Sequence, residues 1–454
     1  MSGVPFEVIV VGGGPIGITA AYALHHAGIN FIVMEQRSNL FDDVGASLVL
    51  SPHILRVFHQ FGILDTLLAI GAPFLHHSEG FGAKTKQFTR SYALRLLEEN
   101  HGCSLVAFHR AHLIRVLYDG LPESAKARFL TNKKLENIIV TSTGAEVLCT
   151  DGSSFRSSIV IGADGAHSKT RSVMRQRALE ANSALAATWD PESPYTASYR
   201  CVWASFHHAS QPGDSYETQD QDRSVVYLTG REKGWIFLYE KLPEPSNERV
   251  FYDDKDIRAF TASFAEWSLN GKLKVGDVLQ DPSLIAGMAN LEEGVINNTS
   301  WGGRIVLVGD ACHKFTPNAG LGFNNGVQDV VSLCNRLRGL LTSSTIFASD
   351  GNLNTAALQS AFEGYQHQRR ELLYGDYDRS VHVTRISTWE TWLYYILARF
   401  ILPIGFIQKL HISRSISPAI QRGLVLDYVS AAEPFSGTVP WIHLMKDHSG
   451  EPSD

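Results

Sequence analysis

The stretch "VIVVGGGPIGITAAYALHHAGINFIVMEQ", from Val8 to Gln36, decides the fold. Its first four residues, Val8–Val11, are apolar and β-branched, which predicts a short strand buried on both faces. A glycine cluster follows, and residues 16–27 then have helical character up to Gly28, a residue type typical of helix ends. Residues 31–34 form a second apolar run. Strand, glycine turn, helix and strand within about 30 residues predict a βαβ unit with parallel strands.

The glycines of this unit have a spacing that suits a dinucleotide. Gly12, Gly14 and Gly17 form GxGxxG directly between strand and helix, and Glu35 follows at the end of the second strand. Such glycines allow a tight turn and let a pyrophosphate approach the N–H groups of the helix N-terminus. A carboxylate at the position of Glu35 accepts hydrogen bonds from ribose hydroxyls and disfavours a 2′-phosphate. We therefore expect a resident FAD or NAD rather than NADP.

Length and composition narrow the class of protein. With 454 residues the chain is long enough for two or three lobes, because single cores stop growing at roughly 250 to 300 residues. A hydrophobic fraction of 44% and a charged fraction of 19% are typical of a globular protein. The net charge of -6, with no dominant basic stripe, gives no reason to expect nucleic acid. Small molecules are the expected partners.

The cysteines indicate the redox compartment. There are five, Cys103, Cys149, Cys201, Cys312 and Cys334, with no CxxC pair and no histidine at metal-ligand spacing. We expect a reducing compartment and no bound metal. The start of the chain lacks the pattern of a signal peptide, because its first apolar run leads directly into the glycine turn. The expected location is therefore cytoplasmic.

The remaining chain predicts an α/β fold of discontinuous domains. Residues 158–161 and 304–308 repeat the pattern of a buried parallel strand, whereas residues 195–252 are rich in the aromatic and β-branched residues of antiparallel strands. We expect a Rossmann-like nucleotide-binding domain with a parallel sheet, an inserted and mostly antiparallel substrate domain, and a C-terminal helical arm. The predicted boundaries are 1–75, 101–175 and 285–375 for the first, 76–100 and 176–284 for the second, and 376–454 for the third.

Two further motifs follow buried strands. The first is "IGADGAHSKTR", Ile161–Arg171, in which Asp164 and Gly165 come just before a basic helix start. The second is "GRIVLVGDACHKFTPNAGLGFNNGVQD", Gly303–Asp329, in which Asp310 follows a strand. A carboxylate at the carboxyl end of a strand could bind a sugar-alcohol chain. A glycine turn at a helix N-terminus exposes N–H groups that could stabilise an anionic ring edge.

The three motifs in this order resemble those of the group A flavoprotein monooxygenases, the family of para-hydroxybenzoate hydroxylase and its fungal relatives in secondary metabolism. The resemblance covers roughly residues 5–375 and implies a resident FAD. It implies that the first glycines and Glu35 hold the ADP half, that Arg110 in "HRAHL" lies near the ribityl chain and pyrophosphate, and that Asp310 binds the ribityl chain. It implies flavin and NADPH contacts for Asp164 and Gly165. The residues that would line the isoalloxazine edge are Pro317, Gly320, Leu321 and Gly322.

The resemblance also implies a reaction. No second GxGxxG follows a strand downstream, so a nicotinamide cofactor, NADPH or NADH, would bind transiently without its own Rossmann unit. In this family the reduced flavin reacts with O2 to a C4a-hydroperoxide, which delivers an oxygen atom to an electron-rich carbon. The expected function is epoxidation or hydroxylation of a hydrophobic secondary metabolite, such as a polyketide, a prenylated aromatic or an indole alkaloid.

The second domain supplies the candidates for substrate contact. Arg200, in "YRCVWASF", aligns with a family arginine that faces the flavin and could donate a hydrogen bond to substrate or peroxide; alternatively it is a surface arginine paired to a carboxylate. Tyr227, Trp235 and Tyr239 could form an aromatic substrate wall, or they could be core residues.

Two alternatives of function and one of location remain open at this point. A flavin-dependent reductase of isoprenoid double bonds and a flavin-binding protein without turnover would share the fold. The apolar stretch "TWLYYILARFILPIGFIQKL", residues 391–410, could be a helical packing arm broken at Pro403. Because Arg399 lies inside it, membrane contact would be peripheral rather than spanning.

Overall fold

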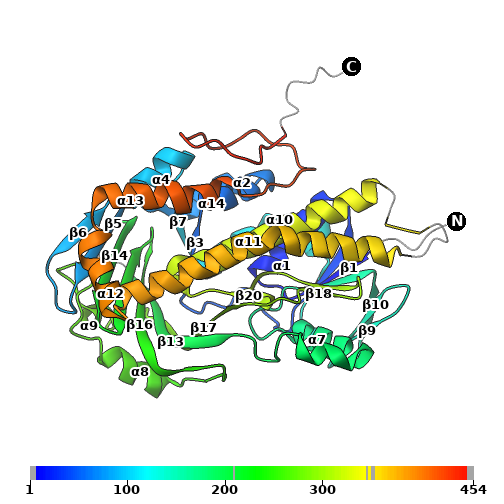
Figure 1. Ribbon diagram of the computed structural model, residues 1–454, viewed down its shortest axis with the longest axis horizontal. Helices are drawn as coiled ribbons and strands as arrows, with labels where there is room; N and C mark the ends of the chain where they lie inside the picture. The colour runs from blue at the N-terminus through cyan, green and yellow to red at the C-terminus, as the bar shows by residue number, and fades with distance from the viewer. Residues whose placement is uncertain (1–6, 208–209, 344–345, 349–352, 447–454) are drawn as a thin grey trace.

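A computed structural model describes residues 7–207, 210–343, 346–348 and 353–446 of the chain. The end of the predicted C-terminal region, residues 447–454, lies outside the described residues. The protein has two large sheets side by side, with helices α10 (Leu321–Thr342) and α11 (Thr355–Ser387) crossing the molecule next to one another (Figure 1).

The first sheet is the predicted Rossmann-like sheet. Its strand β1 pairs in parallel with β2 on one side and with β12 on the other, and β12 pairs in parallel with β19. The three strands predicted from separated parts of the sequence are thus neighbours. In sheet order the strands are β18 (Ser300–Trp301), β19 (Ile305–Leu307), β12 (Ile159–Gly162), β1 (Glu7–Val11), β2 (Asn30–Met34) and β8 (Phe129–Leu130).

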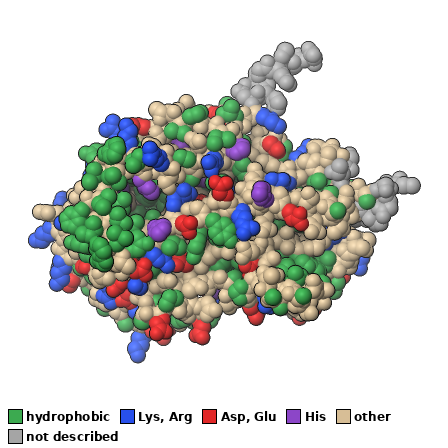
Figure 2. Space-filling view, in the orientation of Figure 1, with side chains coloured by type: hydrophobic (Ala, Val, Ile, Leu, Met, Phe, Trp, Pro, Cys, Tyr) green, Lys and Arg blue, Asp and Glu red, His purple; other side chains and the backbone are tan. Residues whose placement is uncertain are grey.

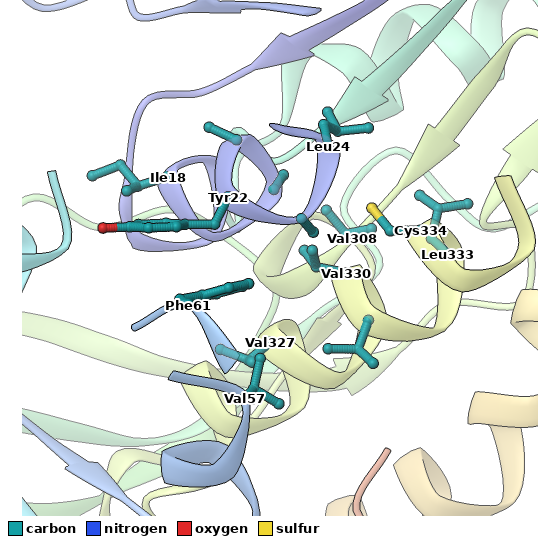
Figure 3. Packing of buried hydrophobic residues seen from close by; sticks show 14 of the residues in the cluster. Ile18, Tyr22, Leu24, Val57, Phe61, Val308, Val327, Val330, Leu333 and Cys334 are labelled. Atoms are coloured by element: carbon teal, nitrogen blue, oxygen red, sulfur yellow. The ribbon is translucent and has the colours of Figure 1, made fainter. Parts of the chain in front are cut away.

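Helix α1 (Pro15–His26) follows the glycine turn and packs between this sheet and helix α10. Its residues Ile18, Tyr22 and Leu24 are buried in the largest hydrophobic cluster (Figure 3). The ring of Tyr22 stacks on Phe61 with centroids 4.6 Å apart. Fully burying a side chain of this size contributes about 1.5–3 kcal/mol, so the cluster fixes the helix whose N-terminus faces the glycine turn.

The second sheet is mostly antiparallel, which together with the first sheet confirms the predicted fold class. One parallel pair, β14 with β5, brings an early segment of the chain to its edge. The sheet continues through Val295, beyond the predicted boundary at residue 284, because β17 pairs with β13 from Ile285 to Glu293 and with β20 at Gly294 and Val295. In sheet order the strands are β20 (His313–Lys314), β17 (Ile285–Val295), β13 (Thr196–His207), β16 (Lys233–Ser246), β15 (Arg223–Thr229), β14 (Asp214–Asp220), β5 (His76–Phe81) and β6 (Phe88–Ser91).

Smaller sheets and helices complete the fold. Three-stranded sheets are formed by β11 (Ser154–Ser157), β10 (Ala145–Cys149) and β9 (Leu135–Val140), and by β3 (Ser47–Leu50), β7 (Val106–His109) and β4 (Ala72–Pro73). The remaining helices before α10 are α2 (Pro52–Gln60), α3 (Leu64–Ile70), α4 (Ala93–His101), α5 (Arg110–Asp119), α6 (Glu123–Lys126), α7 (Lys169–Ala181), α8 (Asp254–Ala262) and α9 (Val275–Val278).

Helix α11 crosses the predicted boundary at residues 375 and 376 without a break. Its first half packs on α10 and buries Phe362 and Tyr365, while its end reaches the second sheet, where Thr388 hydrogen-bonds Tyr199 over 3.0 Å. One rigid helix therefore contacts both sheets, which explains why no turn signal marks the boundary.

The C-terminal arm begins after α11 and turns sharply. Its elements are α12 (Trp392–Ile396), a π-helical turn (Leu397–Ile401), α13 (Gly405–His411), a second π-helical turn (Ile412–Ile416) and α14 (Ser417–Gln421). None of the helices in the described part of the chain combines the length and the hydropathy that a membrane span needs. The pair Trp392–Ile401 and Gly405–Gln421 meets the length and composition criteria only together, and it is bent by 109° around Pro403.

The last described segment is fastened to the nucleotide-binding domain by a buried ion pair. The guanidinium of Arg56, on α2, is fully buried and donates to Glu433 over 2.9 and 2.6 Å and to the His443 carbonyl over 2.6 Å. The same group lies 4.1 Å above the ring of Trp441. Because an unpartnered charge is costly inside a protein, this segment depends on Glu433.

Replacing Glu433 by Ala should lower the free energy of unfolding by about 3 kcal/mol, since Arg56 would keep a buried charge without its carboxylate. The measurement is urea unfolding followed by the fluorescence of tryptophans, which include Trp441. The matched control is Glu99→Ala, which removes the exposed pair with Arg95 and should cost no more than about 0.5 kcal/mol. Equal losses of unfolding free energy in the two variants would contradict the assignment of Glu433 as the carboxylate that balances the buried charge of Arg56.

Candidate functional site

The glycine turn after β1 is shaped for close approach to the backbone. Gly12 has φ of +109° and donates its N–H to the Met34 carbonyl over 2.7 Å. A Cβ at Gly17 would lie 1.8 Å from the Gly12 carbonyl oxygen, so only glycine fits there. A Cβ at Gly14 would meet no atom within 4 Å. The N-terminus of α1 carries no side-chain cap and no acidic residue in its first turn, so its N–H groups suit an anion.

Glu35 lies beside this turn at the end of β2. Its carboxylate is 4% exposed and accepts hydrogen bonds from the Gly13 N–H over 2.8 Å and from the Arg37 N–H and Nε over 2.9 and 3.0 Å. Burial raises the pKa of Glu35, but the donors of Arg37 and Gly13 outweigh it and the pKa is lowered overall. An ionised carboxylate has further acceptor capacity, which suits ribose hydroxyls.

Asp164 and Gly165 form the turn between β12 and α7. The Asp164 carboxylate accepts from the Ser168 hydroxyl over 2.5 Å and from the Thr170 N–H and hydroxyl over 2.9 and 3.0 Å. Burial raises its pKa despite these donors. Gly165 has φ of +82°. The Asp164 side chain therefore holds its own loop, and the end of that strand contacts the glycine turn, since a Cβ at Gly12 would lie 2.5 Å from the Ala163 carbonyl oxygen.

Asp310 lies in the 3-10 turn Gly309–Ala311 that follows β19, and its carboxylate pairs with Lys314. A Cβ at Gly322 would lie 3.7 Å from the Asp310 Oδ1, so the carboxylate faces the first turn of α10. Helix α10 begins at Leu321, and Gly320, which takes a left-handed conformation with φ of +65°, acts as its N-cap. The predicted residues Leu321 and Gly322 therefore belong to a helix N-terminus without a side-chain cap, and Pro317 begins the short turn Pro317–Ala319 before it.

Arg110 starts helix α5, and its guanidinium makes no hydrogen bond or ion pair with any of the residues that the structure describes. Burial lowers the pKa of Arg110 and Arg37 acts in the same direction, while the carboxylates of Asp310, Asp42 and Asp43 act the opposite way. An arginine stays charged at neutral pH, and a half-buried one is normally paired. This cation close to Asp310 therefore suits an anionic ligand such as a pyrophosphate.

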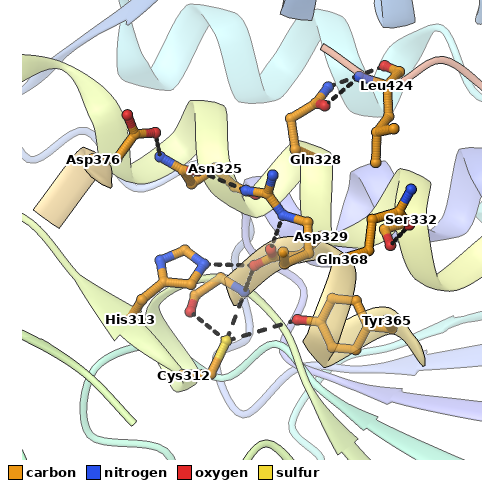
Figure 4. Close-up of polar contacts among 12 residues, drawn as sticks. Cys312, His313, Asn325, Gln328, Asp329, Ser332, Tyr365, Gln368, Asp376 and Leu424 are labelled. Atoms are coloured by element: carbon orange, nitrogen blue, oxygen red, sulfur yellow. Dashed lines mark hydrogen bonds and ion pairs between the residues drawn. The ribbon is translucent and has the colours of Figure 1, made fainter. Parts of the chain in front are cut away.

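A buried ion network behind the Gly309–Ala311 turn was not predicted (Figure 4). Asp329, on α10, is fully buried and accepts from the Gly309 N–H over 3.0 Å, from His313 Nε2 over 2.5 Å and from Arg369 Nε over 2.9 Å. Burial lowers the pKa of His313, but Asp329 more than offsets this and raises it to about 10. Asp329 is the one acidic residue in the sequence of α10, and this was the signal that could have revealed the network.

The same network determines the surroundings of Cys312 and His313. Cys312, His313 and Asp329 lie close enough together to hold a metal ion. Arg369 and the protonated His313 already balance the carboxylate, so the arrangement works as an ion network without a metal. His313 is fully buried and its Nε2 faces Asp329, so it has no position from which to act as a base toward a substrate.

The position of Arg200 corrects its predicted catalytic role. Its guanidinium donates to Glu240 over 2.7 Å through Nε and lies 5.1 Å from the ring of Phe260 on α8. Arg223 pairs with the same carboxylate. The neighbours of Arg200 in β13, Tyr199 and Cys201, point to the opposite face, which packs against the nucleotide-binding domain. Arg200 therefore faces α8, and together with Arg223 and Glu240 it forms a group of three charged side chains on neighbouring strands. This agrees with the alternative interpretation of Arg200 as an arginine paired to a carboxylate.

The predicted aromatic wall is divided between the two faces of the second sheet. Tyr227 packs with Phe206 on the face covered by α8 and α9, so its predicted substrate contact is corrected. Trp235 and Tyr239 lie on the other face, in a cluster that includes Phe74 and Ala107. Both are buried, at 2% and 1% exposure.

Trp235 belongs to a contact between the domains that sequence reasoning missed. Its indole N–H donates to His109 Nδ1 over 3.3 Å, which leaves the proton of His109 on Nε2, where it donates to Asp43 over 2.8 Å. Burial lowers the pKa of His109 although Asp43 acts the opposite way. Trp203 adds a second link, from its Nε1 to the Val44 carbonyl over 2.8 Å. The second sheet thus touches the loop before β3 and the residue before Arg110.

Comparisons with known proteins agree with this geometry. The family model described as "FAD binding domain" matches residues 5–227 and 286–352. The chain is 31% identical over 406 residues to FAD-dependent monooxygenase ausM of Penicillium brasilianum, covering 87% of this chain and 82% of that one. It is 29% identical over 449 residues to FAD-dependent monooxygenase srdH of Neurospora crassa, covering 96% and 98%. The fold resembles Klebsiella pneumoniae HpxO complexed with FAD and uric acid, with a TM-score of 0.67, 19% identity and coverage of 91% and 96%.

Replacing Arg110 by Ala should weaken FAD binding about 10- to 100-fold, because a charge-assisted hydrogen bond contributes about 1.5–3 kcal/mol. The dissociation constant is measured by quenching of flavin fluorescence on titration of deflavinated protein. The matched control is Arg115→Ala on the same helix, whose guanidinium lies over the ring of Phe41 and which should bind FAD as the wild type does. FAD affinity unchanged in the Arg110 variant would show that this guanidinium does not hold the cofactor.

The His313–Asp329 pair predicts a pH dependence of stability. The pKa of His313 is raised from 6.5 to about 10 in the folded protein. Its stabilisation is therefore fully present below pH 6.5 and is lost as the pH rises through 10. The urea midpoint of the wild-type protein should decrease as the pH is raised from about 7 to about 10. The variant His313→Gln should be less stable than the wild type at pH 6, and its urea midpoint should not show the decrease that is due to His313. Parallel curves for the two proteins would refute the charged pair.

Proposed function

We propose that this chain, which belongs to the family of FAD-dependent monooxygenases with this FAD binding domain, uses NADPH or NADH and O2 to add an oxygen atom to a hydrophobic secondary metabolite. FAD is its cofactor, and it is an oxidoreductase. The main structural support for the proposal is Arg110, which is half-buried and unpaired among the described residues. It lies beside Asp310, whose carboxylate faces the N-terminus of α10, a helix start without a side-chain cap. These groups fit a bound dinucleotide with a polyol chain.

The residues divide the binding of FAD among them. Gly12, Gly14 and Gly17, with the N-terminus of α1, would hold the pyrophosphate together with Arg110. Glu35 would accept hydrogen bonds from the ribose hydroxyls. Asp310 would accept from the ribityl hydroxyls, with Lys314 holding its carboxylate in place. Asp164 and Gly165 would act through the backbone of their loop, because the Asp164 carboxylate is engaged by Ser168 and Thr170.

The N-terminus of α10 would meet the ring of the cofactor. Bound FAD supplies the redox chemistry, accepting electrons from the nicotinamide and reacting with O2. The N–H groups at Leu321 and Gly322 point out of the helix start and would stabilise negative charge at the ring edge. Gly320 and Pro317 shape the turn that presents them. The protein groups thus bind, orient and exclude water rather than form covalent bonds to substrate.

The substrate would lie between the ring edge and the second sheet. Trp235 and Tyr239 belong to the apolar face that packs toward the nucleotide-binding domain, which suits an apolar or aromatic compound. Polyketides, prenylated aromatics and indole alkaloids have this character, and either epoxidation or hydroxylation is compatible with it. The five free cysteines support a reducing, cytoplasmic location. Residues 391–410 would be the part that contacts a membrane.

An oxygen electrode distinguishes this proposal from its nearest alternative, a flavin-dependent double-bond reductase. With a substrate that it turns over, the enzyme should consume about one O2 for each NADPH or NADH oxidised and each product formed. Catalase added after the reaction should release little O2, because a coupled reaction leaves little peroxide. Product formed without oxygen uptake would identify a reductase. The absence of flavin reduction by either nicotinamide under argon, with substrate present, would indicate a flavin-binding protein without turnover.

A further inference from the structure

The C-terminal arm presents an apolar surface to solvent, which we name the apolar hook (residues 392–410). Figure 2 shows hydrophobic side chains gathered at the end of the molecule where α12 and α13 lie in Figure 1. Five large side chains of the hook are at least half exposed: Trp392 (79%), Leu393 (51%), Phe400 (56%), Ile404 (50%) and Phe406 (72%). An exposed apolar group of this extent on one face marks an interaction surface.

The hook is held in place by its inner side, so its outward residues are not the result of loose packing. Ala398 within the hook and Ile412 just after it are buried, each at 2% exposure. The guanidinium of Arg399 lies 4.6 Å over the ring of Phe81, and Gln408 accepts a hydrogen bond from the Tyr92 N–H over 2.9 Å. These contacts fix the hook against the β5–β6 hairpin and α4.

The surroundings of the hook are basic although the whole chain has a net charge of -6. Residues 391–426 contain four basic residues, Arg399, Lys409, Arg414 and Arg422, and no Asp or Glu. The adjoining β5–β6 hairpin adds the exposed side chains of Lys84, Lys86 and Arg90. A positive region on an otherwise negative protein complements the anionic headgroups of a lipid leaflet.

The shape of the hook favours a position in the bilayer surface over a membrane span. The two halves meet at 109°. At 1.5 Å per residue, the first half, Trp392–Ile401, reaches only about 15 Å, half of the hydrocarbon thickness of about 30 Å. Arg399 would also be placed inside the hydrocarbon, which is unfavourable. Aromatic residues beside basic ones are typical of segments that lie at the headgroup boundary.

We propose that the apolar hook, with the basic residues beside it, docks the enzyme on the surface of a lipid bilayer that carries anionic headgroups. Trp392, Phe400 and Phe406 insert among the acyl chains near the headgroups, and Lys409 and Arg414 contact the headgroups. This docking develops the membrane contact proposed above for residues 391–410. It involves no step of the reaction, so it holds or fails independently of the proposed oxygenation. A hydrophobic substrate dissolved in the same bilayer would then be close to the enzyme.

The test is flotation of the full-length, FAD-loaded protein with vesicles of phosphatidylcholine alone or with added phosphatidylserine. The protein should float with the mixed vesicles, and only weakly with the neutral ones. The double variant Phe400→Glu, Phe406→Glu should lower the partition coefficient at least about tenfold. Lys409→Glu should lower it about fivefold on the mixed vesicles and leave binding to neutral ones unchanged.

The matched control is Phe251→Glu, which adds the same charge at another exposed phenylalanine (76% exposed) outside the arm. It should float like the wild type. All variants should retain wild-type FAD content and melting temperature, since the changed side chains face solvent. Vesicle binding that is unaffected by the double substitution would overturn the proposal. The proposal would also be overturned if the protein did not bind vesicles and sedimentation velocity showed a dimer that is lost when Phe400 and Phe406 are replaced.

Discussion

The buried carboxylate of Asp329 is the constraint on which the site depends. A lone ion at this depth would cost several kcal/mol, and here Arg369 and His313 balance it while the Gly309 N–H completes its hydrogen bonds. These partners come from α11, from β20 at the edge of the second sheet, and from the turn that carries Asp310. One charge on α10 thus fixes the turn that carries Asp310, the long helix that contacts both sheets, and the junction between the sheets.

The local signals of the sequence sufficed for the nucleotide-binding domain. The apolar runs that became β1, β2, β12 and β19 are buried on both faces, and the glycine spacing has a steric cause, since Gly17 has no room for a side chain. The same local patterns could not give the partners of Asp329, because these come from positions far apart in the chain. These local patterns also contain no signal that would end α11 at the predicted domain boundary, and the helix continues to Ser387.

The errors in the second domain share one physical cause. In a strand, alternate residues face opposite sides, and which side meets the flavin depends on the neighbouring strands and on what covers them. Both faces of the second sheet are covered, one by α8 and α9 and the other by the nucleotide-binding domain. Periodicity therefore could not distinguish Arg200 and Tyr227, which face α8 and α9, from Trp235 and Tyr239, which face the other domain. The contact of Trp235 with His109 could not be predicted without knowing the strand register.

The proposed function has one central claim, that an atom of O2 enters the product. The most direct measurement is the mass of the product formed with ¹⁸O2 in ordinary water, isolated from incubation with NADPH and the metabolites of the producing cells. The account predicts one ¹⁸O atom in each product molecule, and none when ordinary O2 is used in H2¹⁸O. A product that carries no label from ¹⁸O2, or that forms equally well without O2, would contradict it.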